Sequence, residues 1–403
     1  MKSTTLCFLI FLLIDSCENG QLANKSFPSQ DRVTGLMDEA MKKSDLQAVV
    51  AIAINKNGEK ITYKYGKAVW TEDAQVTPEH IFRIWSMTKL VTSIAALQCA
   101  ENGLVGLDDD LSALMPEMTE IPVLSNGILL DPKNKITLRH LLSHTSGFGS
   151  TLTDKELYNF DTINWRYKDL PRRFEIGTNF LYGSSTDWVG KLVEKLSNMD
   201  LESYFRKNIT GPLAMNRTWF NVPDSLKSFI VSRGNRGADG KQPLIELPDR
   251  IPINDVTEYS GGGGLFSTPE DYTKLLQCLL NSGKLGKVKI LKKKTIQEMT
   301  QNQIGDITLN PEGKFFDPGT CCNFNGLMYE NSRWGLAFMI DNNSKDYGRE
   351  AGTVMWGGYM NTYFYIDLKS GIAASIYTQH IPFNHPETTN LFERFSEIIY
   401  SGN

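Results

Sequence analysis

A serine hydroxyl and a lysine amine stand three residues apart at Ser86 and Lys89, at the start of an apolar run that ends near Gly103. Residues i and i+3 of a helix share a face, so the Lys89 amine can reach the Ser86 hydroxyl. A lysine acts as a base only as a neutral amine, a state favoured by burial and nearby positive charge. The pair therefore predicts a serine nucleophile with a lysine base. The same spacing also arises by chance, so the prediction needs partners elsewhere.

A helix predicted over residues 86–102 must position this pair, with Gly103 as its C-terminal stop. Its apolar residues repeat at helical spacing: Met87, Leu90, Val91, Ile94 and Ala95. Ser86 then lies in the first turn, where backbone N–H groups lack helical partners and the helix dipole favours negative charge. The N–H of Ser86 is therefore a candidate for half of an oxyanion hole.

Two further stretches could complete a serine hydrolase, which needs a second proton-transfer group and a second oxyanion donor. Tyr182 and Ser184 lie in a tight turn just ahead of a predicted helix. Residues 356–359 (Trp-Gly-Gly-Tyr) precede a predicted strand, and their glycines allow a substrate to lie close to the backbone. A tyrosine in a turn or a Gly-Gly pair is ordinary by itself. Together with the serine and lysine, these stretches indicate one site.

The composition is that of a globular protein with ample core, since 41% of the 403 residues are hydrophobic and 22% are charged. The net charge of -4 argues against nucleic acid as a partner. Met1-Lys2 and the apolar residues 6–14 predict a secretory signal peptide over residues 1–20. That run is too short to span a membrane, and no later stretch predicts a transmembrane helix. Lipoprotein anchoring at Cys17 is the alternative.

Secretion would permit glycosylation and disulfide bonds. If the host is eukaryotic, the candidate glycosylation sites are Asn24, Asn208, Asn216 and Asn342. Cys99 and Cys278 fall in helical patterns, where a free buried thiol is the commoner state. Cys321 and Cys322 lie in a loop rich in Gly, Asn and Pro and could form bridges. No Cys/His spacing resembles a zinc site, so we expect neither a metal nor a cofactor.

The remaining patterns predict an α/β (α+β) protein. Asn57-Gly58 joins strand-like runs at 48–54 and 60–65, which is typical of a hairpin. Further strands are predicted at 334–340, 362–368 and 372–379, and helices at 31–43, 137–142, 185–196, 267–280 and 387–400. Strands near both ends favour one antiparallel sheet flanked by helices, with a helical insertion. We therefore expect a single domain over 21–403, with its sheet part at about 31–85 and 255–403, its helical part at about 86–254, and a cleft between them.

The chain resembles the serine β-lactamase and penicillin-binding-protein superfamily, in the class C β-lactamase-like branch that includes secreted esterases and D-aminopeptidases. Besides the motifs above, the likeness rests on residues 82–89 (FRIWSMTK), 141–148 (LLSHTSGF), 261–268 (GGGGLFST) and 362–367 (TYFYID). It covers roughly residues 31–400. The resemblance implies a β-lactamase/DD-peptidase-like fold and a serine hydrolase that works through an acyl-enzyme.

The resemblance also implies roles for single residues. Ser86 would be the acylated nucleophile, Lys89 its deprotonating partner, and Tyr182 the shuttle that activates Ser86 or the deacylating water. Ser184 would occupy the family's Tyr-x-Asn/Ser position, whereas His144 would belong to a structural turn. The family's Lys/His-x-Gly strand motif would correspond to Trp356, Gly357 and Gly358, with the N–H of Tyr359 as second oxyanion donor.

Trp356 departs from the family pattern, because enzymes acting on β-lactams and peptidoglycan carry a cation there for the substrate carboxylate. This disfavours β-lactam hydrolysis, and Phe148, Trp356 and Tyr359 could line an apolar acyl pocket. The expected partner is then a small-molecule ester or amide. The alternative is an extracellular matrix or binding protein that keeps the fold while catalysis is idle. Transfer of the acyl group to an acceptor other than water also stays open.

Overall fold

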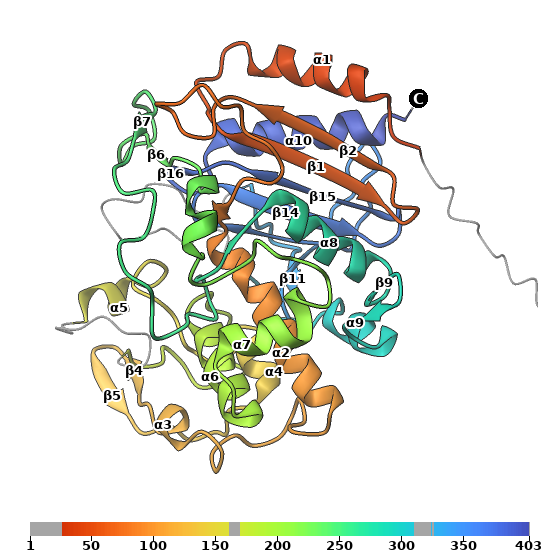
Figure 1. Cartoon of the computed structure of the whole chain (residues 1–403). Helices are drawn as coiled ribbons and strands as arrows, with labels where there is room; N and C mark the ends of the chain where they lie inside the picture. Colours follow the sequence, from red (N-terminus) through yellow and green to blue (C-terminus); the bar gives the residue numbers. More distant parts are fainter. Residues whose placement is uncertain (1–25, 161–169, 310–323, 325, 403) are drawn as a thin grey trace, which may run out of the picture.

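A seven-stranded antiparallel sheet forms the upper part of the molecule (Figure 1). The computed structural model describes residues 26–160, 170–309, 324 and 326–402. In spatial order the strands are β11 (Arg333–Trp334), β12 (Met339–Asp341), β13 (Thr353–Gly358), β14 (Thr362–Asp367), β15 (Ile372–Tyr377), β1 (Val49–Asn55) and β2 (Lys60–Tyr65). β1 pairs with β15, with Ile52 opposite Ser375. The two ends of the chain thus complete one sheet, as expected.

Helices cover both faces of this sheet. α1 (Gln30–Met41) and α10 (Pro386–Tyr400) pack together above it, and α8 (Pro269–Leu280) lies below it against β1 and β15 (Figure 1). Because both faces are covered, all residues of β1 are buried, which explains its nearly continuous apolar sequence. The hairpin predicted at Asn57-Gly58 joins β1 to β2 and is confirmed.

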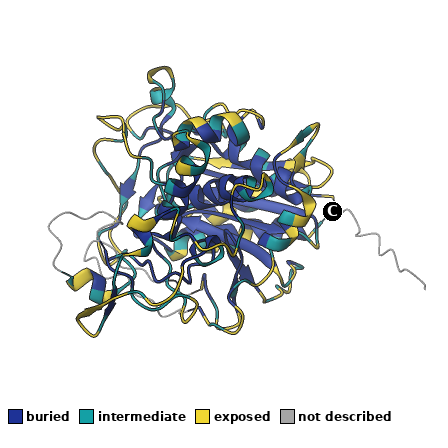
Figure 2. Ribbon diagram, turned by 90° about the horizontal axis from the view of Figure 1, so that it is seen from below, coloured by how far each residue is buried: buried dark blue, intermediate teal, exposed yellow. Residues whose placement is uncertain are grey.

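The helical part lies below the sheet and is built around α2 (Thr88–Glu101), which packs against α6 (Ser185–Ser197). The other helices are α3 (Pro116–Thr119), α4 (Leu138–Leu142), α5 (Lys155–Asn159), α7 (Leu201–Phe205) and, beside α8, α9 (Lys293–Met299). A π-helical turn spans Arg206–Thr210, and 3-10 turns span Trp85–Met87 and Asp224–Phe229. Buried residues concentrate in α2 and the sheet (Figure 2).

Four small sheets lie outside the main sheet in the described part of the chain. β3 (Phe82–Arg83) pairs with β8 (Phe266–Ser267), β4 (Val123–Ser125) with β5 (Ile128–Leu130), and β9 (Lys284–Leu285) with β10 (Val288–Lys289). A three-stranded sheet contains β16 (His380–Ile381), β6 (Gly234–Asn235) and β7 (Ile245–Glu246). The β3–β8 pair matters most, because it brings the segment before α2 beside the segment before α8.

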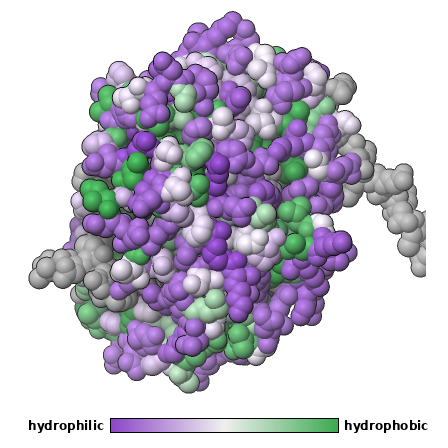
Figure 3. Space-filling model, viewed as in Figure 1, coloured by the Kyte–Doolittle hydropathy of each residue, from purple (hydrophilic) through white to green (hydrophobic). Residues whose placement is uncertain are grey.

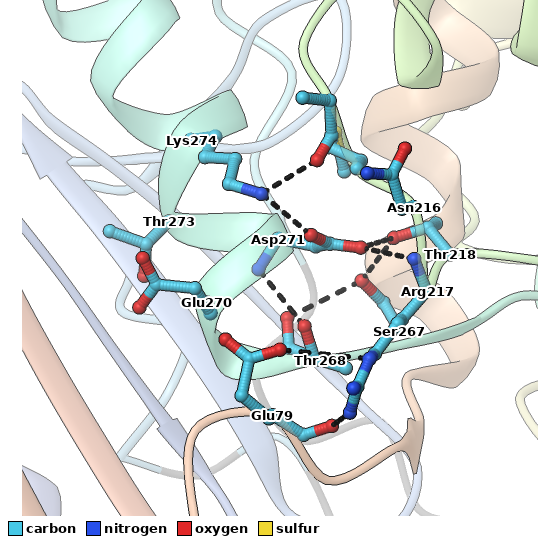
Figure 4. A network of polar contacts seen from close by, with 12 residues as sticks. Glu79, Asn216, Arg217, Thr218, Ser267, Thr268, Glu270, Asp271, Thr273 and Lys274 are labelled. Atoms are coloured by element: carbon cyan, nitrogen blue, oxygen red, sulfur yellow. Dashed lines mark hydrogen bonds and ion pairs between the residues drawn. The ribbon is translucent and has the colours of Figure 1, made fainter. Parts of the chain in front are cut away.

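A polar network at the start of α8 ties the sheet layer to the helical part (Figure 4). The Asp271 carboxylate accepts hydrogen bonds from the N–H of Arg217 at 2.7 Å and the hydroxyl of Thr218 at 3.2 Å. It also pairs with Lys274 at 2.9 Å. The hydroxyl of Thr268 caps the helix by accepting from the N–H of Asp271. Ser267, the first residue of the helix predicted over 267–280, instead lies in β8.

Three predicted elements need correction. α2 begins at Thr88 rather than at Ser86, which lies in the preceding 3-10 turn. Residues 334–340 form a hairpin of two short strands instead of one strand, because the chain turns where the N–H of Gly335 donates to Phe338 O at 2.9 Å. The Trp-Gly-Gly motif precedes β14, as predicted, but it also ends a strand that was not predicted, β13, in which Trp356 pairs with Phe364 of β14.

The predictions about the signal peptide, the cysteines and the glycosylation sites concern residues both inside and outside the described chain. The signal peptide, Cys17, Asn24, Cys321 and Cys322 lie outside the described residues, so secretion, lipidation and disulfide bridges stay predictions. Cys99 and Cys278 are buried free thiols, as expected. Asn216 and Asn342 are exposed, whereas the Asn208 amide donates to Tyr204 O at 3.0 Å.

The outer surface is mainly hydrophilic on the face shown in Figure 3, where apolar side chains form scattered groups. Within the described parts of the chain, no helix combines the length and apolar character needed to cross a membrane.

Candidate active site

Ser86 and Lys89 meet as their spacing predicts. The Lys89 Nζ lies 3.2 Å from the Ser86 Oγ and donates a second hydrogen bond of 2.7 Å to the Gly262 carbonyl oxygen. Lys89 is only 6% exposed, whereas Ser86 is partly open to solvent. The amine is therefore buried and aimed at the hydroxyl, which is the arrangement that a lysine base requires.

The turn that holds Ser86 is fixed by its neighbours in space. The N–H of Ile84 donates to Leu265 O at 3.0 Å, and Trp85 adopts a positive φ of 46°. Gly358 of β13 lies directly against this turn, so a Cβ at that position would come 2.3 Å from Ile84 O. A glycine is required there because no side chain fits between the strand and the turn.

Tyr182 reaches the site from the loop before α6. The hydroxyl of Thr153 donates to Tyr182 O at 2.7 Å, and the N–H of Leu181 donates to His144 O at 3.0 Å. Gly183 packs on the backbone of Gly149, where a Cβ would come within 2.4 Å. The ring of Tyr182 lies 4.8 Å from the Lys89 Nζ, measured to the ring centroid. The loop thus holds the tyrosine beside the lysine.

Trp356 contacts Tyr182 directly. Its indole Nε1 donates a hydrogen bond of 2.9 Å to the Tyr182 hydroxyl oxygen, and the two ring centroids are 4.7 Å apart. Because the tyrosine oxygen accepts this hydrogen bond, the tyrosine's own hydrogen stays available to another group. Trp356 therefore acts on the predicted proton shuttle as well as on the shape of the pocket.

His144 packs behind the site rather than in it. Its ring is fully buried at 4.8 Å from the Tyr182 ring and 5.1 Å from the Trp334 ring, and it adopts a positive φ of 57°. Burial first, and the charge of Lys89 second, hold the pKa of His144 well below its usual range. A neutral imidazole in this position supports the tyrosine by packing.

These residues surround a cavity of about 470 Å³ between the helical part and β13. Its walls include the predicted site residues Ser86, Lys89, Tyr182, Ser184, Trp356, Gly357 and Tyr359. Phe148 does not line the cavity, since its buried ring packs against Trp188 at 5.8 Å. Gly358 does not line the cavity either. Its lack of a side chain allows β13 to lie against the turn that carries Ser86. The hydroxyl of Ser184 is used within the protein, donating to Gly149 O at 2.9 Å.

The comparisons with known proteins agree with this geometry. The family model described as Beta-lactamase matches residues 33–395. This chain belongs to the beta-lactamase family. A structure of a β-lactamase/D-alanine carboxypeptidase from Pseudomonas syringae shares the fold, with a TM-score of 0.65 over 92% of this chain and 99% of that one, at 16% identity. The predicted β-lactamase/DD-peptidase-like fold is confirmed.

Within the beta-lactamase family, similar relatives carry the names of esterases and acyltransferases. Monacolin J acid methylbutanoyltransferase of Aspergillus terreus is 32% identical over 79% of this chain and 81% of the relative. Lovastatin esterase of Penicillium rubens is 28% identical over 80% and 85%. The structure of simvastatin synthase from Aspergillus terreus superposes with a TM-score of 0.77 at 28% identity, covering 92% and 98%. The chain is a serine hydrolase or acyltransferase of the β-lactamase fold.

Sequence reasoning missed several residues of this beta-lactamase-family site. Asp187, in the first turn of α6, accepts hydrogen bonds from the hydroxyl of Ser260 at 2.6 Å and from the N–H of Gly262 at 3.0 Å. It thereby fixes Gly262, the residue whose carbonyl oxygen accepts the hydrogen bond from Lys89. An acid in the first turn of a helix is too common to attract notice. Phe324 and Phe383 also line the cavity, and no local pattern singles them out. In the described parts of the chain, no group of His, Cys, Asp and Glu is arranged to hold a metal ion.

Proposed function

We propose that this chain cleaves or transfers the acyl group of small esters through an acyl-enzyme on Ser86. The observation that carries the proposal is the buried Lys89 amine 3.2 Å from the Ser86 hydroxyl, beside a tyrosine whose oxygen accepts a hydrogen bond from Trp356. The relatives named as a methylbutanoyltransferase and as an esterase support the same reaction class.

In acylation, the Ser86 Oγ attacks the carbonyl carbon of the ester while its proton passes to the amine nitrogen of Lys89. The N–H groups of Ser86 and Tyr359 stabilise the negative oxygen of the tetrahedral intermediate. The bond to the leaving alcohol then breaks, and the leaving oxygen receives a proton through Tyr182. The products of this half-reaction are the Ser86 ester and a free alcohol.

In the second half-reaction, water or another alcohol attacks the Ser86 ester and gives its proton to Tyr182 or Lys89. The bond to the Ser86 Oγ breaks, and the serine regains its proton. Water yields a carboxylic acid and an alcohol yields a new ester. The cavity has more apolar than polar surface, lined by Trp356, Phe324 and Phe383, which suits an apolar acyl group or acceptor. Product analysis with and without added alcohols separates hydrolysis from transfer.

A fluorophosphonate probe tests the nucleophile. We expect the folded full-length protein to gain one phosphonyl group on the peptide that contains Ser86, because the probe reacts with activated serines. Ser86→Ala should not be labelled, while Ser112→Ala, which removes a partly exposed serine that does not line the catalytic cavity, should label as the wild type does. Equal labelling of Ser86→Ala, or none of a folded wild-type protein, would contradict the proposal.

Ester turnover should exceed β-lactam turnover. Trp356 supplies no positive charge where carboxylate-binding family members carry one, so we expect kcat/KM for p-nitrophenyl butyrate to exceed that for nitrocefin by roughly 10²-fold or more. Hydrolysis of either substrate gives a coloured product, which allows a direct comparison on one preparation. A ratio near one, or the reverse preference, would refute the inference about substrate class.

A further inference from the structure

A second cavity, of about 380 Å³, is lined by the three arginines Arg83, Arg233 and Arg250. Arg83 lies in β3, and the other two flank the strands β6 and β7. Of the described residues that line this cavity, the one acidic residue is Asp249, whose side chain is exposed. The cavity is therefore strongly cationic.

The three guanidinium groups lack acidic partners. Arg233 Nη2 donates to Pro248 O at 2.9 Å, and Arg250 Nη1 donates to the carbonyls of Lys227 and Ile230. Across the described part of the chain, no carboxylate forms an ion pair with any of the three. The Nε atoms of Arg83 and Arg233 are also buried without a hydrogen-bond partner.

Two other arginines in the same region of the sequence, Arg217 and Arg236, form ion pairs with carboxylates. Arg217 lies 3.6 Å from the carboxylate of Glu79, and its side chain also donates to Glu79 O (Figure 4). Arg236 pairs with both Asp45 and Glu387. Arg217 and Arg236 therefore have acidic partners, which the three arginines of this cavity lack.

Their arrangement is costly unless an anion compensates it. Burial first, and the charge of Arg233 second, lower the pKa of Arg83 to about 10. A buried unpaired donor costs free energy, and each like charge added nearby raises that cost. Guanidinium groups bind carboxylate and phosphate oxygens with two parallel hydrogen bonds, so a group of this kind would satisfy the free donors.

The cationic cavity lies next to the catalytic cavity. The Arg83 guanidinium stacks 3.8 Å from the ring centroid of Trp85, and Trp85 lines the catalytic cavity beside Ser86. A smaller cavity of about 160 Å³ shares Ser260 with the catalytic cavity and Arg83 with the cationic one. This connecting cavity has mixed charge, because its lining includes Asp255, Glu258 and Lys227. An anion is therefore attracted most strongly to the cationic cavity with its three arginines.

We propose that Arg83, Arg233 and Arg250 form an anion-binding subsite that holds a carboxylate or phosphate group on the part of the substrate remote from the reacting ester. The inference deepens the proposed function and rests on it for the identity of the ligand as a substrate. The subsite would provide the positive charge that is missing at Trp356. This charge would lie in the cationic cavity, which Trp85 separates from the catalytic cavity.

Calorimetric titration of the full-length protein with inorganic phosphate and, separately, with glutarate tests the subsite. We expect saturable binding of at least one of them, with a Kd raised about 10-fold by Arg233→Gln and by Arg250→Gln. Binding of one probe only identifies phosphate or carboxylate as the ligand chemistry. The control Arg394→Gln removes the same charge from an exposed pair on α10, and its Kd should stay within about 2-fold of wild type.

No saturable binding of either anion to the wild type, or equal losses in Arg233→Gln and Arg394→Gln, would overturn the subsite. Two variants guard against misfolding, which thermal unfolding detects, since Arg233 and Arg250 make different backbone hydrogen bonds. The readout needs no turnover. Retained anion binding by a protein that fails fluorophosphonate labelling would therefore contradict the proposed function and leave the subsite standing.

Discussion

Lys89→Met is expected to lower kcat for ester turnover by roughly 10³-fold, within the range for loss of a general base. Methionine keeps the buried apolar stem of the side chain but removes the amine that lies 3.2 Å from the Ser86 Oγ. The Gly262 carbonyl also loses its 2.7 Å donor. That loss should cost about 1–3 kcal/mol in the free energy of unfolding, which a domain of ordinary stability tolerates. The variant should therefore be folded and nearly inactive.

Steady-state kinetics and the rate of fluorophosphonate labelling measure this effect, and urea unfolding measures the stability. Lys191→Met is the matched control, because Lys191 lies on α6 in an i,i+3 ion pair with Glu194, away from Ser86. It should change kcat by less than about 2-fold, as expected for a surface pair. If Lys89→Met kept half of the wild-type kcat, Lys89 could not be the base, and another group would have to accept the serine proton.

The parts of the fold with strong local signals are predictable from sequence. The Asn57-Gly58 turn is one case, because Gly58 adopts a φ of 85° that few other residues accept. The helix predicted over 387–400 is another, since Pro386 starts α10 and apolar residues repeat along it at helical spacing. The Ser86–Lys89 contact also follows from spacing alone, even though the pair straddles a 3-10 turn and α2.

Features that depend on contacts between residues far apart in the sequence cannot be predicted from local patterns. The hydrogen bond from Trp356 to Tyr182 joins residues 174 positions apart. Residues 334–340 have the composition of one strand, yet Gly335 lies so close to Met299 O that a Cβ would come within 2.2 Å. No local pattern shows that approach. The sequence places Phe148 among the candidate pocket residues, but its buried ring packs against Trp188 and does not line the cavity.

The arginine cavity illustrates the same limit for the site. Arg83 stands only three positions before Ser86, but its neighbours Arg233 and Arg250 come from a segment about 150 residues later. The Trp-Gly-Gly motif contains no cation, so the sequence pattern predicts a site without carboxylate-binding charge. The fold supplies positive charge through β3, whose pairing with β8 no short motif encodes.

Gly358→Ala is expected to lower kcat/KM by about 10²-fold and the free energy of unfolding by about 1–3 kcal/mol. The added methyl group would lie 2.3 Å from Ile84 O and 2.4 Å from the Thr362 Oγ1. Ile84 O accepts the N–H of Met87 in the turn that carries Ser86. β13 and the turn that carries Ser86 must therefore move apart. This displaces Ser86 relative to Trp356 in β13 and to Tyr359, which follows β13.

Gly35→Ala provides the matched control for this prediction. Gly35 lies inside α1 with open space around its Cα, so the same added methyl group meets nothing within 4 Å. Alanine stabilises a helix interior relative to glycine, and the free energy of unfolding should rise by about 0.5–1 kcal/mol while kcat/KM stays unchanged. Urea unfolding and ester kinetics on both variants give the comparison. Wild-type activity in Gly358→Ala would mean that the turn and β13 need not touch for Ser86 to react, and the close approach at Ile84 would then have no part in catalysis.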